Sequence, residues 1–316
     1  MDETLIFGPV PSRRLGRSVG INNIPPKICT YSCVYCQLGK SLEMLADRRN
    51  FYDPAMLVAK TREKLDNARS NNEPIDYLTI VSDGEPTLDK GLGDLLRGLG
   101  ELGVKTAVIT NSTLLDRPEV RADICLADWV SVKVDTLNEK IWRKIDRPHK
   151  EIRFNAMLEG IETFAASYEG QLVTETMLVR DLNDREDILG KTAEFISRIS
   201  PCLSYLSIPT RPPALKGVRP PEEDRINNAF QIFLCQGLNA EYLIGYEGNQ
   251  FAYTGNIEAD ILSITSVHPM REDAVKAYLE KAGGDFFAID ALVGKNKLLV
   301  SEYNGDRFYL RTLARP

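Results

Sequence analysis

Short apolar runs alternate with amphipathic stretches along most of the chain. The runs typical of buried strands are 77–81, 104–110, 129–135, 172–179 and 205–208. The stretches with helical spacing of apolar residues, or helix-forming composition, are 53–71, 88–102, 153–167, 188–197 and 222–238. Strands that alternate with helices at this spacing predict right-handed βαβ units and a parallel sheet.

The two ends of the chain have a different pattern. Gly and Pro interrupt residues 5–28, which predicts loops and short strands. Near the other end, two short helices are expected at 272–281 and 286–293, followed by a hairpin at 297–311 that turns at Asn304-Gly305. Helix, helix and hairpin form a winged-helix outline. We therefore expect a barrel-like unit over 1–235, a mixed strand-and-loop linker over 236–258, and a small winged-helix-like domain over 259–316.

Composition places the chain among ordinary soluble enzymes. It has 316 residues, of which 43% are hydrophobic and 27% charged. Its apolar runs are far shorter than the ~20 residues of a membrane span, and no basic region precedes an apolar stretch at the N-terminus. We expect a cytoplasmic protein with no membrane partner. The net charge of −6 argues against a protein that coats nucleic acid nonspecifically.

Three cysteines lie close together in the loop 29–37, the cysteine loop. Cys29, Cys33 and Cys36 are spaced C-x3-C-x2-C. Three thiolates can each ligate one corner iron of a 4Fe-4S cube, which leaves the fourth iron open to a small molecule with adjacent amino and carboxylate groups, such as S-adenosylmethionine. Zinc is the alternative, but no fourth ligand follows nearby. The remaining cysteines, Cys125, Cys202 and Cys235, are predicted to be buried, reduced thiols.

The cysteine motif, with Tyr35 just before its last Cys, resembles the cluster loop of the radical S-adenosylmethionine (radical SAM) superfamily. The preceding segment Gly8-Pro-Val-Pro-Ser-Arg-Arg-Leu-Gly-Arg-Ser18 resembles a subgroup often placed with the wyosine-forming tRNA enzymes. The resemblance extends over residues 5 to about 235. It implies an α/β fold, a partial (β/α)6 TIM-like barrel, which about six βαβ units also fit. A Rossmann sheet is the alternative, but its Gly fingerprint is missing after the first strand.

The resemblance also implies cofactors and chemistry. A 4Fe-4S cluster receives an electron, from reduced ferredoxin or flavodoxin, and cleaves S-adenosylmethionine to methionine and a 5′-deoxyadenosyl radical that abstracts hydrogen from a substrate. Candidate cofactor-binding residues follow predicted strands, where parallel barrels place their sites. Gly84-Glu85-Pro86, with Asp83 in place of the first Gly, resembles the Gly-Gly-Glu region that binds the methionyl amino group. The further candidates by resemblance are Thr110, Asn111, Ser112, Arg180, Asn183 and, beside adenine, Tyr35.

Part of this set has an alternative role in local structure. Asp83 and Pro86 are also typical of a turn that caps the next helix. Residues 110–112 are also typical of the N-cap of a following helix.

In the strand Val130-Ser-Val-Lys-Val-Asp135, period-two alternation places Ser131, Lys133 and Asp135 on the face opposite the valines, toward the barrel interior. Lys133 and Asp135 are the candidate catalytic residues. Lys133 is interpreted as a base, a proton donor or a carbonyl-binding amine, as wyosine-forming enzymes use a Lys for a Schiff base with pyruvate. The alternative is a structural pair with Asp135.

Basic residues suggest a substrate class. Two groups are concentrated in separate loops, and a third lies near the N-terminus: Arg143, Lys144, Arg147, His149, Lys150 and Arg153; Arg211, Lys216 and Arg219; Arg13, Arg14 and Arg17. They are interpreted either as solvated charges or as a positive rim and anion clamp for a phosphate-bearing substrate. From Asp260 onward, eight Lys and Arg balance eight Asp and Glu. An RNA base is the favoured substrate, with tRNA as the RNA named first. The alternatives are a peptide or protein side chain, and an iron-sulfur regulator that reads DNA.

Overall fold

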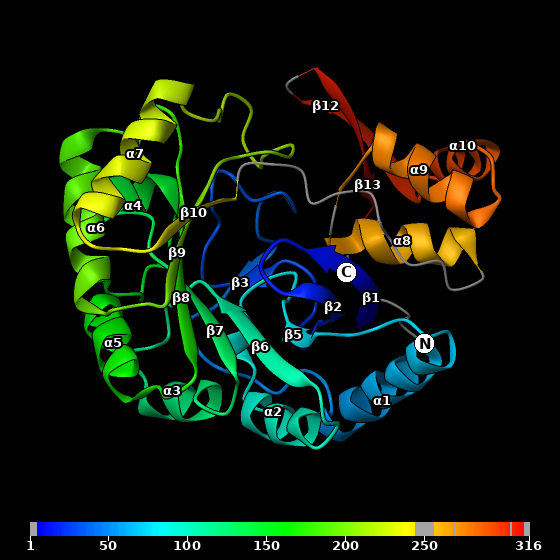
Figure 1. The fold of residues 1–316 in the computed structure, drawn as a ribbon, viewed down its shortest axis with the longest axis horizontal. Coiled ribbons are helices and arrows are strands. Elements are labelled where there is room, and N and C mark those ends of the chain that lie inside the picture. The colour runs from blue at the N-terminus through cyan, green and yellow to red at the C-terminus, as the bar shows by residue number, and fades with distance from the viewer. Residues whose placement is uncertain (1–4, 244–255, 268, 304, 313–316) are drawn as a thin grey trace.

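A curled eight-stranded sheet forms the centre of the protein (Figure 1). The computed structural model describes residues 5–243, 256–267, 269–303 and 305–312. The strands of the sheet, in spatial order, are β1 (Ile6–Ser12), β2 (Gly16–Ile21), β5 (Tyr77–Ile80), β6 (Lys105–Thr110), β7 (Trp129–Lys133), β8 (Gln171–Met177), β9 (Leu203–Ser207) and β10 (Ala240–Leu243). Each neighbouring pair from β2 to β10 is parallel, whereas β1 is antiparallel to β2.

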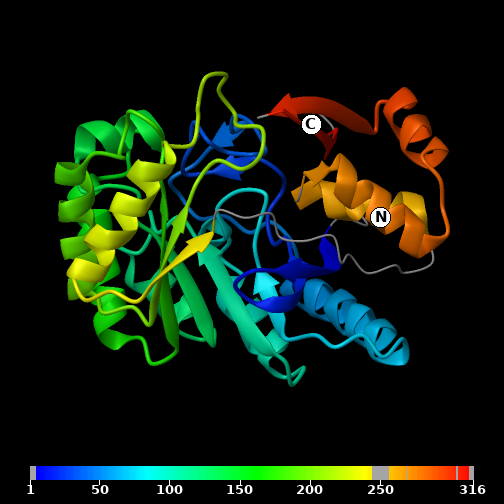
Figure 2. The same ribbon diagram turned by 45° about the horizontal axis from the view of Figure 1, so that its top comes forward.

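Helices cover the outer face of the sheet (Figures 1 and 2). They are α1 (Pro54–Ser70), α2 (Leu92–Gly100), α3 (Pro118–Ile124), α4 (Glu139–Ile145), α5 (Phe154–Ser167), α6 (Glu186–Arg198) and α7 (Glu223–Cys235). The Asp53 carboxylate caps α1 by accepting a hydrogen bond from Ala55 N at 3.0 Å, and Pro54 occupies the first turn. The alternating strands and helices confirm the predicted α/β half-barrel.

Alternation along the inner strands explains where the site forms. On β7, Val130 and Val132 are fully buried in the core between sheet and helices. The other face carries Trp129, which packs in a small lumen core with Ala107, Val173 and Tyr205. Ser131 and Lys133 follow Trp129 on this face and line a cavity. The lumen is therefore apolar at the amino ends of the strands and polar at their carboxyl ends, as predicted for residues 130–135.

The sheet extends beyond the predicted limits at both ends. The Gly- and Pro-rich start of the chain forms the β1–β2 hairpin, and β2 pairs directly with β5. Residues 240–243, within the predicted linker, form β10 and pair with β9. The other predicted linker residues include 244–255, which lie outside the described residues. The next helix, α8 (Ile257–Val267), begins before the predicted boundary at 259.

The prediction that the three scattered cysteines are buried is wrong. Cys125, Cys202 and Cys235 are exposed, with free thiols. Cys125 follows the last residue of α3, Cys202 precedes β9, and Cys235 is the last residue of α7. Side chains at the ends of elements on the outer layer are not enclosed by neighbouring elements, so an apolar residue type alone does not bury them.

The C-terminal part forms a unit with its own core. It comprises α8, β11 (Met270–Arg271), α9 (Glu272–Ala282), α10 (Phe287–Gly294), β12 (Leu298–Tyr303) and β13 (Asp306–Arg311), with strand order β11-β13-β12. The two predicted helices and the hairpin are present. Asn304 of its predicted turn lies outside the described residues. Assignment of this unit to the winged-helix class stays a prediction.

Among the described residues, contacts from α8 and from the C-terminal hairpin join the C-terminal unit to the half-barrel. Helix α8 lies against β1, where Val10 packs into the core of the unit (Figure 1). On the hairpin, the Tyr303 hydroxyl donates a hydrogen bond to the Pro209 carbonyl oxygen at 3.1 Å. Pro209 belongs to the loop after β9, so the hairpin reaches the edge of the barrel that carries the cavity. No helix in the described part of the chain is both long and apolar enough to cross a membrane.

Candidate active site

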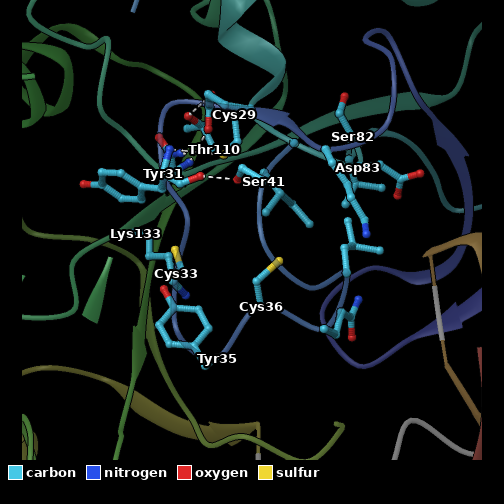
Figure 3. A pocket seen from close by; sticks show the side chains of 18 of the residues that line it. Cys29, Tyr31, Cys33, Tyr35, Cys36, Ser41, Ser82, Asp83, Thr110 and Lys133 are labelled. Atoms are coloured by element: carbon cyan, nitrogen blue, oxygen red, sulfur yellow. Dashed lines mark hydrogen bonds between the residues drawn. The ribbon is translucent and has the colours of Figure 1, made fainter. Parts of the chain in front are cut away.

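The cysteine loop opens onto a cavity of about 260 Å³ at the carboxyl ends of the strands (Figure 3). All three cysteines of the motif line it, together with residues that follow β5 and β6 and residues on β7 and β8. Of the predicted site residues, those that line this cavity are Cys29, Cys33, Cys36, Tyr35, Gly84, Glu85, Thr110, Asn111 and Lys133. The structure thus brings together side chains separated by more than 100 positions in the sequence.

Backbone hydrogen bonds hold the cysteine loop in place. It begins at β3 (Ile28–Cys29), which pairs with β4 (Glu43–Met44). Val34 N donates to the Ile145 carbonyl at 2.8 Å, and Ser32 N donates to the Asp146 carbonyl at 3.0 Å. The end of α4 and the residues after it therefore support the loop from outside the cavity. Because these bonds use main-chain groups, the thiols remain available as ligands.

Gly84 allows β3 to approach the strand end that carries Glu85. A Cβ at position 84 would overlap the carbonyl oxygen of Ile28. That same oxygen accepts a hydrogen bond from Glu85 N at 3.2 Å. Only glycine fits between the two segments, and this close packing places Cys29 and Glu85 in the same cavity wall.

The three thiols fit an iron-sulfur cluster. Each is partly exposed toward the cavity, and thiolates are the usual ligands of such clusters. Tyr31 N donates to Cys29 Sγ at 3.4 Å, and Asn111 Nδ2 lies 3.6 Å from the same sulfur. No three His, Cys, Asp or Glu side chains among the described residues are grouped to ligate a single metal ion. A cube with one thiolate on each of three corner irons does not require the sulfurs to converge on one point.

Burial controls the protonation of the thiols in the metal-free protein. It raises the pKa of Cys29 to about 12, with the nearby Glu85 charge adding to the effect. Burial also raises the pKa values of Cys33 and Cys36. Ligands must be deprotonated to bind metal, so cluster assembly at neutral pH releases protons from this loop.

Glu85 is fixed by four hydrogen bonds. Its Oε1 accepts from Thr110 Oγ1 and Thr87 Oγ1, both at 2.6 Å, and from Thr87 N at 3.1 Å. Its Oε2 accepts from Asn111 N at 2.7 Å. The bond to Thr87 N caps the short helix η1 (Pro86–Leu88), so the predicted capping role is present, although Glu85 performs it and not Asp83. Oε2 retains acceptor capacity for an ammonium group.

Asp83 lies in the same turn and ties it to Asn22. Its Oδ2 accepts a hydrogen bond from Asn22 Nδ2 at 3.2 Å, and its backbone nitrogen donates to Asn22 Oδ1 at 3.2 Å. Burial raises the pKa of Asp83 to about 7, against the effect of the Asn22 hydrogen bond. Pro86 begins η1 and is buried outside the cavity lining.

Asn111 and Ser112 have different roles. Asn111 lines the cavity, and its Nδ2 donates to Thr30 Oγ1 at 2.7 Å, which ties the end of β6 to the cysteine loop. Ser112 is fully buried with a positive φ of 71°, and its Oγ accepts from Lys133 N at 2.9 Å. Its hydroxyl therefore bonds to the neighbouring strand, Ser112 does not line the cavity, and its cofactor contact stays a prediction.

Lys133 belongs to an ion-pair network with Arg14, Glu175 and Asp135, which we call the Lys133 network. Lys133 Nζ lies 3.3 Å from Glu175 Oε1 and 3.7 Å from Asp135 Oδ1, and Arg14 pairs with Glu175 Oε2. Burial alone would lower the pKa of Lys133, but the two carboxylates outweigh burial and raise the pKa above its usual range. Lys133 is therefore protonated, which supports the predicted structural pair with Asp135 over a nucleophilic amine.

Asp135 is held by groups from three elements. Tyr35 donates its hydroxyl hydrogen to Asp135 Oδ2 at 2.5 Å, and Met177 N donates to Oδ1 at 2.8 Å. The Lys133 ammonium also lies over the Tyr35 ring, 5.1 Å from its centroid. Tyr35 thus connects the cysteine loop to the Lys133 network, and its ring borders the cavity (Figure 3).

Arg180 and Asn183 do not line the cavity. The Asn183 side chain is fully buried: it accepts from Val179 N and donates to the carbonyl oxygens of Asp135 and Met177, each at 2.8 Å. Arg180 donates to the Pro220 carbonyl and pairs with Glu222 at 2.7 Å. Both side chains stabilise the loop after β8, and a ribose or carboxylate contact by either residue stays a prediction.

Sequence reasoning missed Glu175. It lies on the lumen face of β8, between Val173 and Met177, and lines the cavity. Burial would raise its pKa, but Lys133 and Arg14 outweigh burial and lower it to about 2. A charged residue inside a predicted buried strand was the available signal, and it is the same signal that identified Lys133.

A second cavity of about 270 Å³ adjoins the first. The two share Arg14, Tyr35, Cys36, Gln37, Lys133 and Glu175, and the second extends to the end of β9 and to Arg211. Of the basic residues in the two predicted rim loops, Arg211 lines the second cavity and the others line neither. Of the N-terminal basic group, Arg14 lines both cavities and Arg13 lines the second. Arg143, Lys150 and Arg153 instead line a separate concave surface on α4 and the start of α5.

The chain belongs to the Radical SAM superfamily, whose family model matches residues 23–191. Membership implies S-adenosylmethionine and a 4Fe-4S cluster as cofactors, which the cavity fits. Among its relatives is UPF0026 protein MJ1312 of Methanocaldococcus jannaschii, which is 46% identical over 98% of this chain and 97% of the relative. A UPF0026 protein of Helicobacter pylori (strain ATCC 700392 / 26695) is 29% identical over 96% and 97% of the two chains.

Solved structures share the fold at low sequence identity. TYW1, solved with a lysine-pyruvate adduct bound, superposes with a TM-score of 0.54 at 18% identity and covers 70% of this chain and 74% of its own. Streptococcus suis SuiB, solved with S-adenosylmethionine bound, has a TM-score of 0.50 at 15% identity. The match covers 71% of this chain and 49% of the SuiB chain. The predicted resemblance to the superfamily is confirmed, with TYW1 among the structural neighbours.

Proposed function

We propose that this protein is a radical SAM enzyme that generates a 5′-deoxyadenosyl radical to abstract hydrogen from a substrate. One observation carries the proposal: the three cysteines of the motif open onto the same cavity as Glu85 and Asn111. Cys29, Cys33 and Cys36 would hold a 4Fe-4S cluster, which would supply the low-potential electron for reductive cleavage of S-adenosylmethionine. The residues of this chain bind, orient and enclose the reactants.

Glu85 and its partners form the binding wall for the amino acid end of S-adenosylmethionine. The Glu85 carboxylate is buried, and Thr87, Thr110 and Asn111 fix its orientation. A fixed carboxylate lowers the entropic cost of orienting an ammonium group beside it. Tyr35, whose ring borders the cavity, is the proposed neighbour of the adenine.

The Lys133 network forms the boundary between the two cavities. Two cations and two carboxylates balance in charge. Arg14, Lys133 and Glu175 line both cavities, whereas Asp135 lines neither. We propose that the first cavity holds S-adenosylmethionine and that the second receives the substrate. Lys133 then acts as a positioning cation at this boundary, because its ammonium group is held by Glu175 and Asp135.

Production of 5′-deoxyadenosine tests the proposed chemistry. Protein reconstituted anaerobically with iron and sulfide, then reduced with dithionite, should release 5′-deoxyadenosine from S-adenosylmethionine. Cys33→Ala should lose both the iron-sulfur absorption and the product, whereas Cys235→Ala, which alters an exposed thiol on α7, should retain both. Zinc in the reconstituted site, or undiminished iron content in Cys33→Ala, would contradict the proposal.

The proposed substrate is an RNA base, with tRNA as the favoured source. Structural similarity to TYW1 supports it, and the C-terminal unit, which we propose is winged-helix-like, offers a separate recognition surface. Its Tyr303–Pro209 contact joins that unit to the loop that borders the second cavity. The balanced charge of this unit favours the peptide alternative instead, since duplex readers carry excess positive charge.

A gel shift with bulk tRNA at two salt concentrations separates the two substrate classes. RNA binding should be strong at low salt and weaken as salt rises, because phosphate contacts release counterions. Absence of a shift at low salt would direct the search to polypeptide substrates. Comparison of modified nucleosides between deletion and parent cells would then identify the base.

A further inference from the structure

A basic surface lies outside the cysteine loop, on the side away from the cavity lining. It comprises the exposed side chains Arg143, Lys144, Arg147 and Lys150, from α4 and the residues after it, and Lys216 and Arg219, from the loop before α7. We call this set the basic face. Exposed acidic residues within the same two segments are Glu139, which pairs with Arg143 at 2.8 Å, Glu151, and Glu222, which pairs with Arg180 at 2.7 Å. The basic face is therefore positive on a chain whose net charge is −6.

Main-chain contacts place the basic face directly against the cluster ligands. Val34 follows Cys33 in the cysteine loop and contacts both basic segments. Its N–H donates to Ile145 O at 2.8 Å, and its carbonyl accepts from Leu215 N at 3.1 Å. Farther along the first segment, His149 N donates to Thr30 O at 2.8 Å. Cys33 Sγ itself lies 3.5 Å from Asp146 Oδ1, in the residue before Arg147.

The basic face has no access to the reaction cavities. None of its six residues lines the cavity of the cysteine loop or the cavity that adjoins it. A substrate bound there would not reach the site of hydrogen abstraction. An electron, in contrast, passes through packed protein and needs nearness to the cluster without an open passage.

We propose that the basic face is the docking site of a small acidic electron-transfer protein of the flavodoxin or ferredoxin type. This inference rests on the proposed function, which needs a one-electron reductant at the cluster held by Cys29, Cys33 and Cys36. The donor gives one electron to the cluster and is itself oxidised by one electron. Charge complementarity steers such a partner to this positive surface on a protein whose net charge is −6, and it raises the association rate.

Charge reversal on the basic face tests the proposal. The variant is Arg147→Glu with Lys150→Glu; both side chains are exposed, and no ion pair joins either to another described residue. The matched control is Lys105→Glu with Lys191→Glu, which makes the same change in charge at the amino end of β6 and on α6. Reduced flavodoxin is mixed anaerobically with reconstituted protein, and the rate of cluster reduction is followed by absorbance.

We expect flavodoxin to reduce the cluster of R147E/K150E at least about 10-fold more slowly than that of the control at low salt. The difference should shrink as ionic strength rises, and dithionite should reduce both proteins equally. Equal rates with flavodoxin would overturn the proposal. A tRNA gel shift lost in R147E/K150E together with unchanged flavodoxin rates would also overturn it, and would assign the face to RNA.

The readout separates this proposal from the proposed function. Cluster reduction does not require S-adenosylmethionine cleavage. If flavodoxin reduction depends on the basic face but dithionite yields no 5′-deoxyadenosine, the docking site stands and the radical chemistry fails. If 5′-deoxyadenosine forms and flavodoxin rates are insensitive to the charge reversal, the chemistry stands and the docking site fails.

Discussion

The Lys133 network gives a quantitative prediction about stability. Glu175→Gln removes the carboxylate that lies between Lys133 and Arg14, two cations whose side chains are only 16% and 18% exposed. At an effective dielectric constant of about 20, unit charges separated by 3.3 Å, as in Lys133–Glu175, attract by about 5 kcal/mol. Desolvation offsets part of this attraction, but removing one partner leaves buried cations uncompensated. We expect Glu175→Gln to lower the free energy of unfolding by about 3–5 kcal/mol.

Lys133→Met should cost less. Glu175 then keeps Arg14 as its partner, and Asp135 keeps its hydrogen bonds from Tyr35 and Met177 N. The double variant Lys133→Met with Glu175→Gln should cost about 1–3 kcal/mol less than the sum of the two single changes, because each change removes the same ion pair.

Urea unfolding of the metal-free protein under reducing conditions measures these differences. The only two tryptophans, Trp129 and Trp142, are both buried in the half-barrel, so their fluorescence reports its unfolding. Glu162→Gln is the control, because its pair with Arg198 at 3.2 Å is about half exposed and should contribute less than about 1 kcal/mol. Additive single changes, or a cost of Glu175→Gln as small as that of the control, would refute the reasoning.

Three further experiments test the site. Borohydride treatment with pyruvate should trap no adduct on Lys133, because the amine is protonated, and an adduct found there by mass spectrometry would show a reactive lysine. Gly84→Ala should reduce iron incorporation strongly, since its Cβ would overlap the Ile28 carbonyl; Gly190→Ala, where a Cβ meets nothing within 4 Å, should incorporate iron normally, as iron assays would show. Glu85→Gln should weaken S-adenosylmethionine binding in calorimetry by about 10- to 100-fold, the loss of a charged hydrogen bond, and unchanged affinity would remove Glu85 from the binding wall.

Local patterns in the sequence were sufficient for the parts of the site that lie within one element. Three thiols within eight residues predict a ligand set without knowledge of the fold, and all three line one cavity. Period-two alternation over 130–135 correctly placed Ser131 and Lys133 in the lumen, because a strand has a fixed side-chain direction. The start of α1 at Asp53-Pro54 was equally predictable, since capping depends on adjacent residues.

Features that depend on pairing between distant segments were not predictable. The partner of Lys133 is Glu175, and that contact follows from the register of β7 against β8, in which the two residues are directly paired. The Asn183 amide has the polarity expected of a ligand contact, but backbone groups of two other segments use it. Similarly, β2 joins the barrel although its sequence is interrupted by Gly, because β5 supplies its hydrogen bonds.

The contact between α8 and β1 has a consequence for synthesis of the chain. Strand β1 lies at the open border of the sheet, and Val10 from it packs into the core of a unit made more than 240 residues later. A nascent half-barrel that has left the ribosome without α8 would present an uncovered sheet border and would be prone to aggregate. Chains truncated before residue 257 should therefore require chaperones or collect in inclusion bodies, even though their cysteine loop is complete.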